Sequence, residues 1–147
     1  MRLFGHPLHP MLVHLPIALW TLATACDGLT LAGVAQAWPP AWLCLVVGLV
    51  AALPAMAAGL ADFAGLAESA APTALRHMTL MGAAWSAYLA ALILRSHGLA
   101  VTAAPAPWAM AAGFVGFVLL VAGAAQGGRL VYGLGVGVAR AADKPEP

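Results

Sequence analysis

Four long apolar runs constrain the fold of this chain more than any other feature of its sequence. They cover roughly residues 10–31, 41–61, 73–94 and 108–126. At a rise of about 1.5 Å per residue, each run forms a helix long enough to cross the roughly 30 Å hydrocarbon core of a bilayer. Only 7% of the 147 residues are charged, whereas a soluble domain has about 25%. The chain therefore cannot cover a water-facing surface, and we expect the lipid bilayer to surround it.

The expected fold is all-α: an integral membrane four-helix transmembrane bundle with both termini on the same side. A single transmembrane domain would include residues 1–147, with a tail over 127–147 after the last span. Lys and Arg are enriched on the cytoplasmic side of membrane proteins. One of the six, Arg95, falls on the side away from the termini, and the others fall on the side of the termini: Arg2, Arg76, Arg129, Arg140 and Lys144. This bias predicts that the N- and C-termini are both cytoplasmic.

The sequence points to neither a nucleic-acid partner nor a repeat array. The formal net charge is +1 and no basic stripe is present, which excludes nucleic acid as a partner. No solenoid-type period is visible. The two helix pairs allow a weak internal duplication, but no motif in one pair matches a motif in the other. Cys26 and Cys44 lack the spacing of a metal finger and are expected to pack as small hydrophobes.

Most polar residues gather at one end of the expected bundle. Antiparallel spans bring the starts of the first and third runs to the same end as the finishes of the second and fourth. The polar side chains expected at this end are His6, His9, His14, Asp62, Arg76, His77, Gln126, Arg129 and Tyr132. Such side chains are costly near lipid unless they have partners or a role. The opposite end carries Asp27 and Arg95, which we expect to form a pair because pairing reduces the burial cost of both charges.

Two arrangements of these side chains would make a cofactor or metal site. His14 and His77 lie about one turn inside their helices, so they could face each other as the axial ligands of haem b. Alternatively, a non-haem transition metal could be held by a set of five side chains: His6, His9, His14, Asp62 and His77. Imidazole and carboxylate groups suit zinc or iron, and methionines in the same half of the bundle admit copper.

Four sequence motifs resemble a bacterial membrane family catalogued as domain of unknown function 2231. In order, they are His6-Pro7-Leu8-His9-Pro10 with Val13-His14-Leu15-Pro16, Gly59-Leu60-Ala61-Asp62, the His77 position, and Gly127-Gly128-Arg129-Leu130-Val131-Tyr132 running on to Gly135-Val136-Gly137-Val138. The chain departs from the usual pattern at Arg129, where an acidic residue is common, and at Gly133-Leu134. The resemblance implies a four-span protein of the bacterial inner membrane and no established activity. Some relatives resemble fusions to Rieske-type iron–sulfur domains, an association with redox chemistry.

Three functions fit these observations. The first is a redox-active membrane protein with a histidine-ligated haem or metal site at the cytoplasmic face and a redox partner protein. The second is a non-catalytic membrane subunit or scaffold, because the sequence has no nucleophile–base pair, phosphate loop or zincin motif. The third is a small transporter or proton-handling protein, since Pro16 and Pro54 interrupt helices and broken helices can line sites. The Gly113-x-x-Gly116 spacing would also allow close helix packing in a homodimer.

Overall fold

The computed structural model describes residues 2–3, 6–96 and 104–138, with side chains from residue 7 onward. The long helices are α2 (His14–Leu31), α3 (Trp38–Phe63), α4 (Ala71–Arg95) and α5 (Pro107–Gly128). The short elements are β1 (Arg2–Leu3), β2 (His6–Pro7), α1 (Leu8–Leu12), η1 (Ala35–Ala37) and the π-helical turn η2 (Arg129–Gly133). The strands β1 and β2 form a two-residue antiparallel pairing. Residues 139–147 of the predicted tail lie outside this description.

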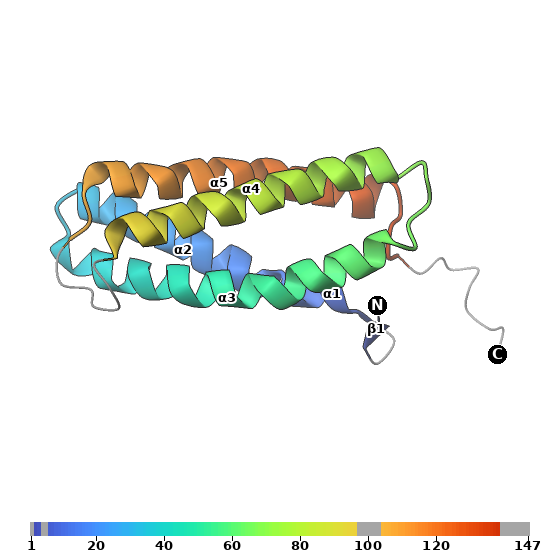
Figure 1. The fold of residues 1–147 in the computed structure, drawn as a ribbon, viewed down its shortest axis with the longest axis horizontal. Helices are drawn as coiled ribbons and strands as arrows, with labels where there is room; N and C mark the ends of the chain where they lie inside the picture. The colour runs from blue at the N-terminus through green and yellow to red at the C-terminus, as the bar shows by residue number, and fades with distance from the viewer. Residues whose placement is uncertain (1, 4–5, 97–103, 139–147) are drawn as a thin grey trace.

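The four long helices form an antiparallel bundle (Figure 1). Within the described residues, four stretches are long and apolar enough to cross a membrane: Leu8–Leu31, Ala35–Phe63, Ala71–Arg95 and Pro107–Gly133. The described chain begins and ends at the same end of the bundle (Figure 1). The predicted all-α, four-span architecture is therefore confirmed.

Prolines determine where several helices begin. Pro39 and Pro40 lie in the first turn of α3, so that helix begins at Trp38, three residues before the predicted span. The first helical turn has no carbonyl partner for its N–H groups, and proline loses nothing there. Deeper in the first span, the helix is interrupted at Val13, between α1 and α2. Pro16 has no N–H for the carbonyl of Leu12, which is the physical reason for an interruption at this level.

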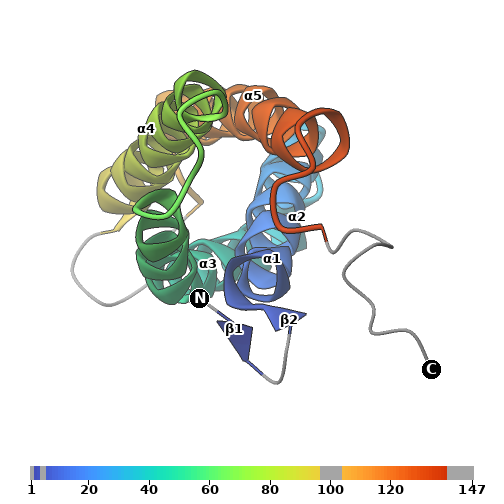
Figure 2. The same ribbon diagram turned by 90° about the vertical axis from the view of Figure 1, so that its right-hand side faces the viewer.

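The bundle consists of two helical hairpins, α2 with α3 and α4 with α5, that close against each other through α3–α4 and α2–α5 contacts. The end-on view shows the four helices arranged around a central axis (Figure 2). Trp20 and Tyr88 stack at the centre, with ring centroids 5.0 Å apart. Gly113 and Gly116 are buried inside the bundle, where Gly116 lies beneath the Tyr88 ring. Their spacing therefore serves packing within the chain.

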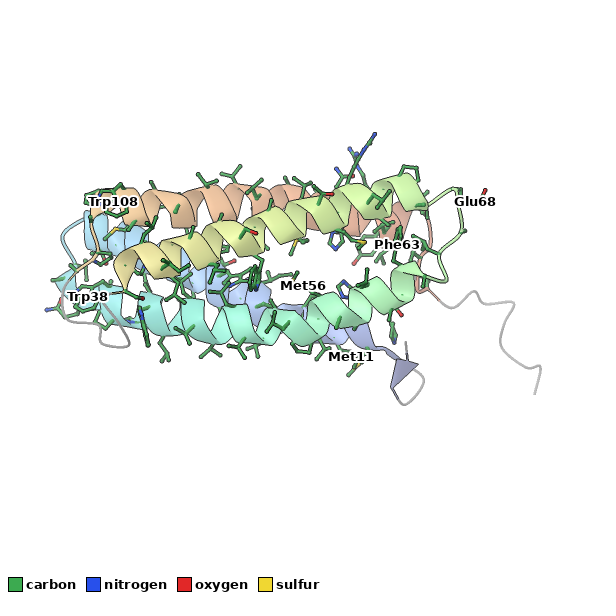
Figure 3. The ribbon with its side chains drawn as sticks, viewed as in Figure 1. Met11, Trp38, Met56, Phe63, Glu68 and Trp108 are labelled. Carbon is green, nitrogen blue, oxygen red and sulfur yellow. The ribbon has the colours of Figure 1, made fainter. Side chains whose placement is uncertain are left out.

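Many large apolar side chains point away from the bundle, as a lipid-embedded protein requires. Among them, Val50, Ile93 and Val118 are each more than 60% exposed. Trp38 and Trp108 lie at one end of the molecule and Glu68 at the other (Figure 3). Tryptophan is typical of the boundary between lipid and water. This surface is consistent with a bilayer around the long axis of the bundle.

The predicted pair between Asp27 and Arg95 is confirmed. Arg95 Nη1 and Nη2 donate to the two carboxylate oxygens of Asp27, each at 2.8 Å, and Arg95 Nε donates to the carbonyl oxygen of Ala91 at 2.9 Å. Both charged side chains are 2% exposed. A two-pronged, fully hydrogen-bonded geometry is what makes a buried ion pair tolerable. It joins α2 to α4 at the end of the bundle away from the histidines.

Candidate functional site

An apolar cavity of about 550 Å³ opens inside the histidine end of the bundle. Its walls come from all five α-helices and from the C-terminal segment, and include Ile17, Phe63, Met78 and Met81. Cavities of about 300–1,000 Å³ lined mainly by apolar groups are typical of small-molecule and cofactor sites. His9, Asp62 and His77 supply the titratable groups of the wall. This cavity is the candidate site.

His9 is held in the cavity wall by helix α3. Its Nδ1 lies 2.7 Å from the carbonyl oxygen of Ala55. A carbonyl oxygen only accepts, so Nδ1 carries the proton and donates it, which leaves the lone pair on Nε2. The ring also lies against Gly59, one turn further along α3: a Cβ at this position would be 2.9 Å from Nδ1 and Cε1 of His9. Only glycine permits this close approach.

His77 is held in the same way by helix α5. Its Nδ1 donates to the carbonyl oxygen of Gly123 at 2.8 Å, which again leaves the lone pair on Nε2. A Cβ at Gly127 would be 3.2 Å from Cε1 of His77. For both imidazoles, a carbonyl oxygen fixes the tautomer, and a glycine one turn later on the same helix leaves room for the ring.

The two fixed imidazoles lie next to each other, edge to face, between helices α1 and α4. Their ring centroids are 6.2 Å apart and their planes are nearly perpendicular, at 86°. Both side chains are half-buried. The pair that the structure brings together is therefore His9 with His77, whereas the sequence predicted His14 with His77.

His14 is an exposed residue that is not among those lining the cavity. Its Nδ1 lies 3.4 Å from the carbonyl oxygen of Met11, and the side chain borders a shallow groove formed by Pro7, Pro10 and Met11. The reason is helical phase: five residues separate His9 from His14, a rotation of about 140° around a helix axis. If one of the two imidazoles faces the cavity, the other faces outward.

Three of the five predicted ligands of a non-haem metal, His9, Asp62 and His77, line the cavity. Asp62 is half-buried in the cavity wall near the end of α3, and His6 lies in β2, without a described side chain. Within residues 7–96 and 104–138, no three His, Cys, Asp or Glu side chains are grouped closely enough to hold a metal ion. The side chains that lie close enough together in the cavity wall to share one metal ion are the imidazoles of His9 and His77.

The C-terminal motif forms one wall of the cavity. Leu130 and Val131 of η2 line it, and so do Val136 and Gly137 beyond. The chain folds back because Gly135 and Gly137 have positive φ angles of 67° and 76°, a conformation that glycine adopts without strain. The Val136 N–H then donates to the Leu130 carbonyl oxygen at 2.9 Å. The amino-terminal arm, Asp62, His77 and the tail thus meet at one end of the bundle, as predicted.

The groups that position the imidazoles were not identified from the sequence. The carbonyl oxygens of Ala55 and Gly123 belong to apolar stretches, and a backbone acceptor leaves no signature in side-chain patterns. The glycines were the available signal, because Gly59 and Gly127 both stand in the motifs shared with the resembled family. Their contacts with His9 and His77 give those motifs a structural reason.

Comparison with known proteins is consistent with this picture. No curated protein and no solved structure matches the chain. A family model described as a predicted membrane protein matches residues 5–140, nearly the whole chain. This range includes both cavity histidines and the glycine-rich C-terminal segment. The chain therefore belongs to the DUF2231 family of predicted membrane proteins.

Proposed function

We propose that this protein is a redox-active membrane protein that holds a b-type haem between His9 and His77. The observation that carries the proposal is the neighbouring pair of imidazoles, each fixed by a backbone carbonyl at the wall of an apolar cavity. Ligating histidines commonly donate their other ring nitrogen to a carbonyl oxygen or carboxylate, which orients the ring and raises its basicity. His9 and His77 already have this arrangement.

The separation of the rings fits one metal centre between them. Metal–imidazole nitrogen bonds are about 2.0–2.1 Å long. With the half-width of each ring added, two imidazoles on opposite sides of one ion have centroids about 6–6.5 Å apart. The centroids of His9 and His77 are 6.2 Å apart. The measured separation is therefore compatible with ligation of a single ion by both side chains.

The donor set favours haem over a bare ion. Protein zinc sites use three or four protein ligands, and the described part of the chain groups no three candidate ligands. Haem needs only axial ligands from the protein, and two histidines on different helices suffice. The apolar cavity of about 550 Å³ supports the same choice. When bound, such a haem would supply one-electron transfer.

The rest of the site would isolate this centre. The wall is mainly apolar, which would keep water away from the haem, and the folded-back C-terminal segment lines the cavity. Asp62 is the carboxylate of the wall. We place the site at the cytoplasmic end of a bacterial inner-membrane protein, where a redox partner protein would exchange electrons with it.

An absorption experiment tests the proposal. The protein is purified in detergent, supplied with haem and compared before and after dithionite. We expect the sharp α and β bands of a six-coordinate reduced haem in the wild-type protein, and their loss in His9→Ala and in His77→Ala. His14→Ala is the matched control, since its imidazole lies outside the cavity, and it should keep the spectrum. A wild-type protein that takes up no haem, or a spectrum lost only in His14→Ala, would refute the assignment.

A further inference from the structure

We infer that the chain is an internal duplication: residues 9–63 and 77–131 are two copies of one helical-hairpin unit that pair through the same surface. Asp27 and Arg95, at equivalent positions of the two copies, direct this pairing. Both hairpins begin at the same end of the bundle (Figure 1), so the axis relating them runs along the bundle, as in membrane proteins built from parallel repeats. The inference does not depend on the proposed haem.

Three contacts near the bundle axis join residues separated by the same number of positions. His9 faces His77, Trp20 stacks on Tyr88, and Asp27 pairs with Arg95. In each contact the second residue is 68 positions after the first. When two copies of a unit pair around a two-fold axis, residues near that axis meet their own equivalents. A ladder of such pairs, running from one end of the bundle to the other, is the signature of that arrangement.

Contacts away from the axis repeat with the same offset. The carbonyl oxygens that hold the histidines belong to Ala55 and Gly123, each 46 residues after its imidazole. Gly59 and Gly127 then occupy equivalent places beneath those imidazoles.

The central aromatic rings repeat the pattern. Gly48 lies beneath Trp20, where a Cβ would be 2.8 Å from the indole, and Gly116 lies beneath Tyr88, where a Cβ would be 3.0 Å from the ring. These contacts lie within the two hairpins separately, so the equivalence includes the packing inside each unit.

At the charge pair, equivalent positions of the two copies carry opposite charges. In a symmetric dimer of one hairpin, this axial position would carry two like charges, buried and repelling each other. With Asp27 in one copy and Arg95 in the other, the charges of the two hairpins attract each other. Two identical hairpins would repel each other at this position. Opposite charges that favour one pairing and penalise the alternatives are a recognised source of specificity. The pair therefore makes the two hairpins obligate partners.

A charge exchange in the full chain tests the equivalence of the two positions. Asp27→Arg and Arg95→Asp should each lower the midpoint of thermal unfolding by about 10 °C or more, because each buries two like charges. The double exchange should return the midpoint to within about 4 °C of wild type. A new Arg at 27 would find the carbonyl of Ala23, equivalent to the Ala91 carbonyl that Arg95 uses, and both alanines are buried. A double exchange as unstable as the single variants would overturn the role of the pair.

A second measurement tests the duplication without altering charge. Gly48→Ala and Gly116→Ala each push a methyl group into an equivalent ring, so the two midpoints should fall by similar amounts. Gly82→Ala is the control in α4, because a Cβ there meets nothing within 4 Å, and it should not lower the midpoint. If one of the two variants is destabilised and the other behaves like Gly82→Ala, the two hairpins are not copies of one unit.

Discussion

Each cavity imidazole is positioned by one carbonyl oxygen and one glycine, and neither contact involves a second side chain. For His9 these are the Ala55 carbonyl and Gly59. A side chain at position 59 would overlap the ring, since its Cβ would be 2.9 Å from two ring atoms. The orientation of the His9 ring thus depends on the absence of a side chain at Gly59.

Gly59→Ala should weaken haem binding about ten-fold or more, because disturbing the groups that orient a ligand typically costs 10–100-fold in affinity. Haem titration followed by absorption measures the effect. Gly65→Ala is the control, since a Cβ at Gly65 meets nothing within 4 Å. Equal affinities in the two variants would show that Gly59 has no positioning role.

Among the structural elements, the C-terminal segment differs most from an ordinary helix end. It continues α5 into the π-helical turn η2 and then folds back over the cavity. Adjacent residues of this segment have opposite environments: Val131 is half-buried in the cavity wall, whereas Tyr132 is 92% exposed. The segment therefore forms a wall of the cavity.

Val131→Asn should lower the free energy of unfolding by about 1–3 kcal/mol, because it places an amide without a partner in an apolar wall. Tyr132→Asn, one residue further, should change it by about 0.5 kcal/mol or less. Thermal unfolding in detergent compares the two variants. If the two substitutions are equally costly, the C-terminal segment does not line the cavity as described.

At the scale of the whole molecule, the exposed arginines of the described helices lie at one end of the bundle. Arg76 and Arg129 are exposed at the histidine end, whereas Arg95 at the other end is buried and paired with Asp27. The positive-inside rule counts Lys and Arg near the ends of the spans, and the two exposed arginines belong to the histidine end. This strengthens the proposal that the histidine end faces the cytoplasm.

A fluorescent protein that matures only in the cytoplasm, fused to the C-terminus, should therefore be bright. A periplasm-dependent alkaline phosphatase fused at the same place should be inactive. The reverse pattern would invert the proposed orientation and move the cavity to the opposite face of the membrane.

Composition and pattern alone were enough to predict the four spans, the gathering of polar residues at one end and the Asp27–Arg95 pair. These features follow from the cost of exposing charge or backbone to lipid, which depends on residue type and order and little on detailed packing. The same reasoning could not choose between His9 and His14. That choice depends on the phase of one short helix before its interruption at Val13.

Only the tertiary structure decided which imidazole enters the cavity, which carbonyls hold the pair and how the two hairpins correspond. The duplication left few identical residues, because Ala, Leu, Val and Gly exchange readily where a helix faces lipid or a small neighbour. The duplication is still visible at the positions that touch across the bundle axis. There His9 contacts His77, and Asp27 pairs with Arg95. Contacts between residues far apart in the sequence depend on the rotation of each helix about its axis and on how the two hairpins pair. Both are determined only when the bundle packs.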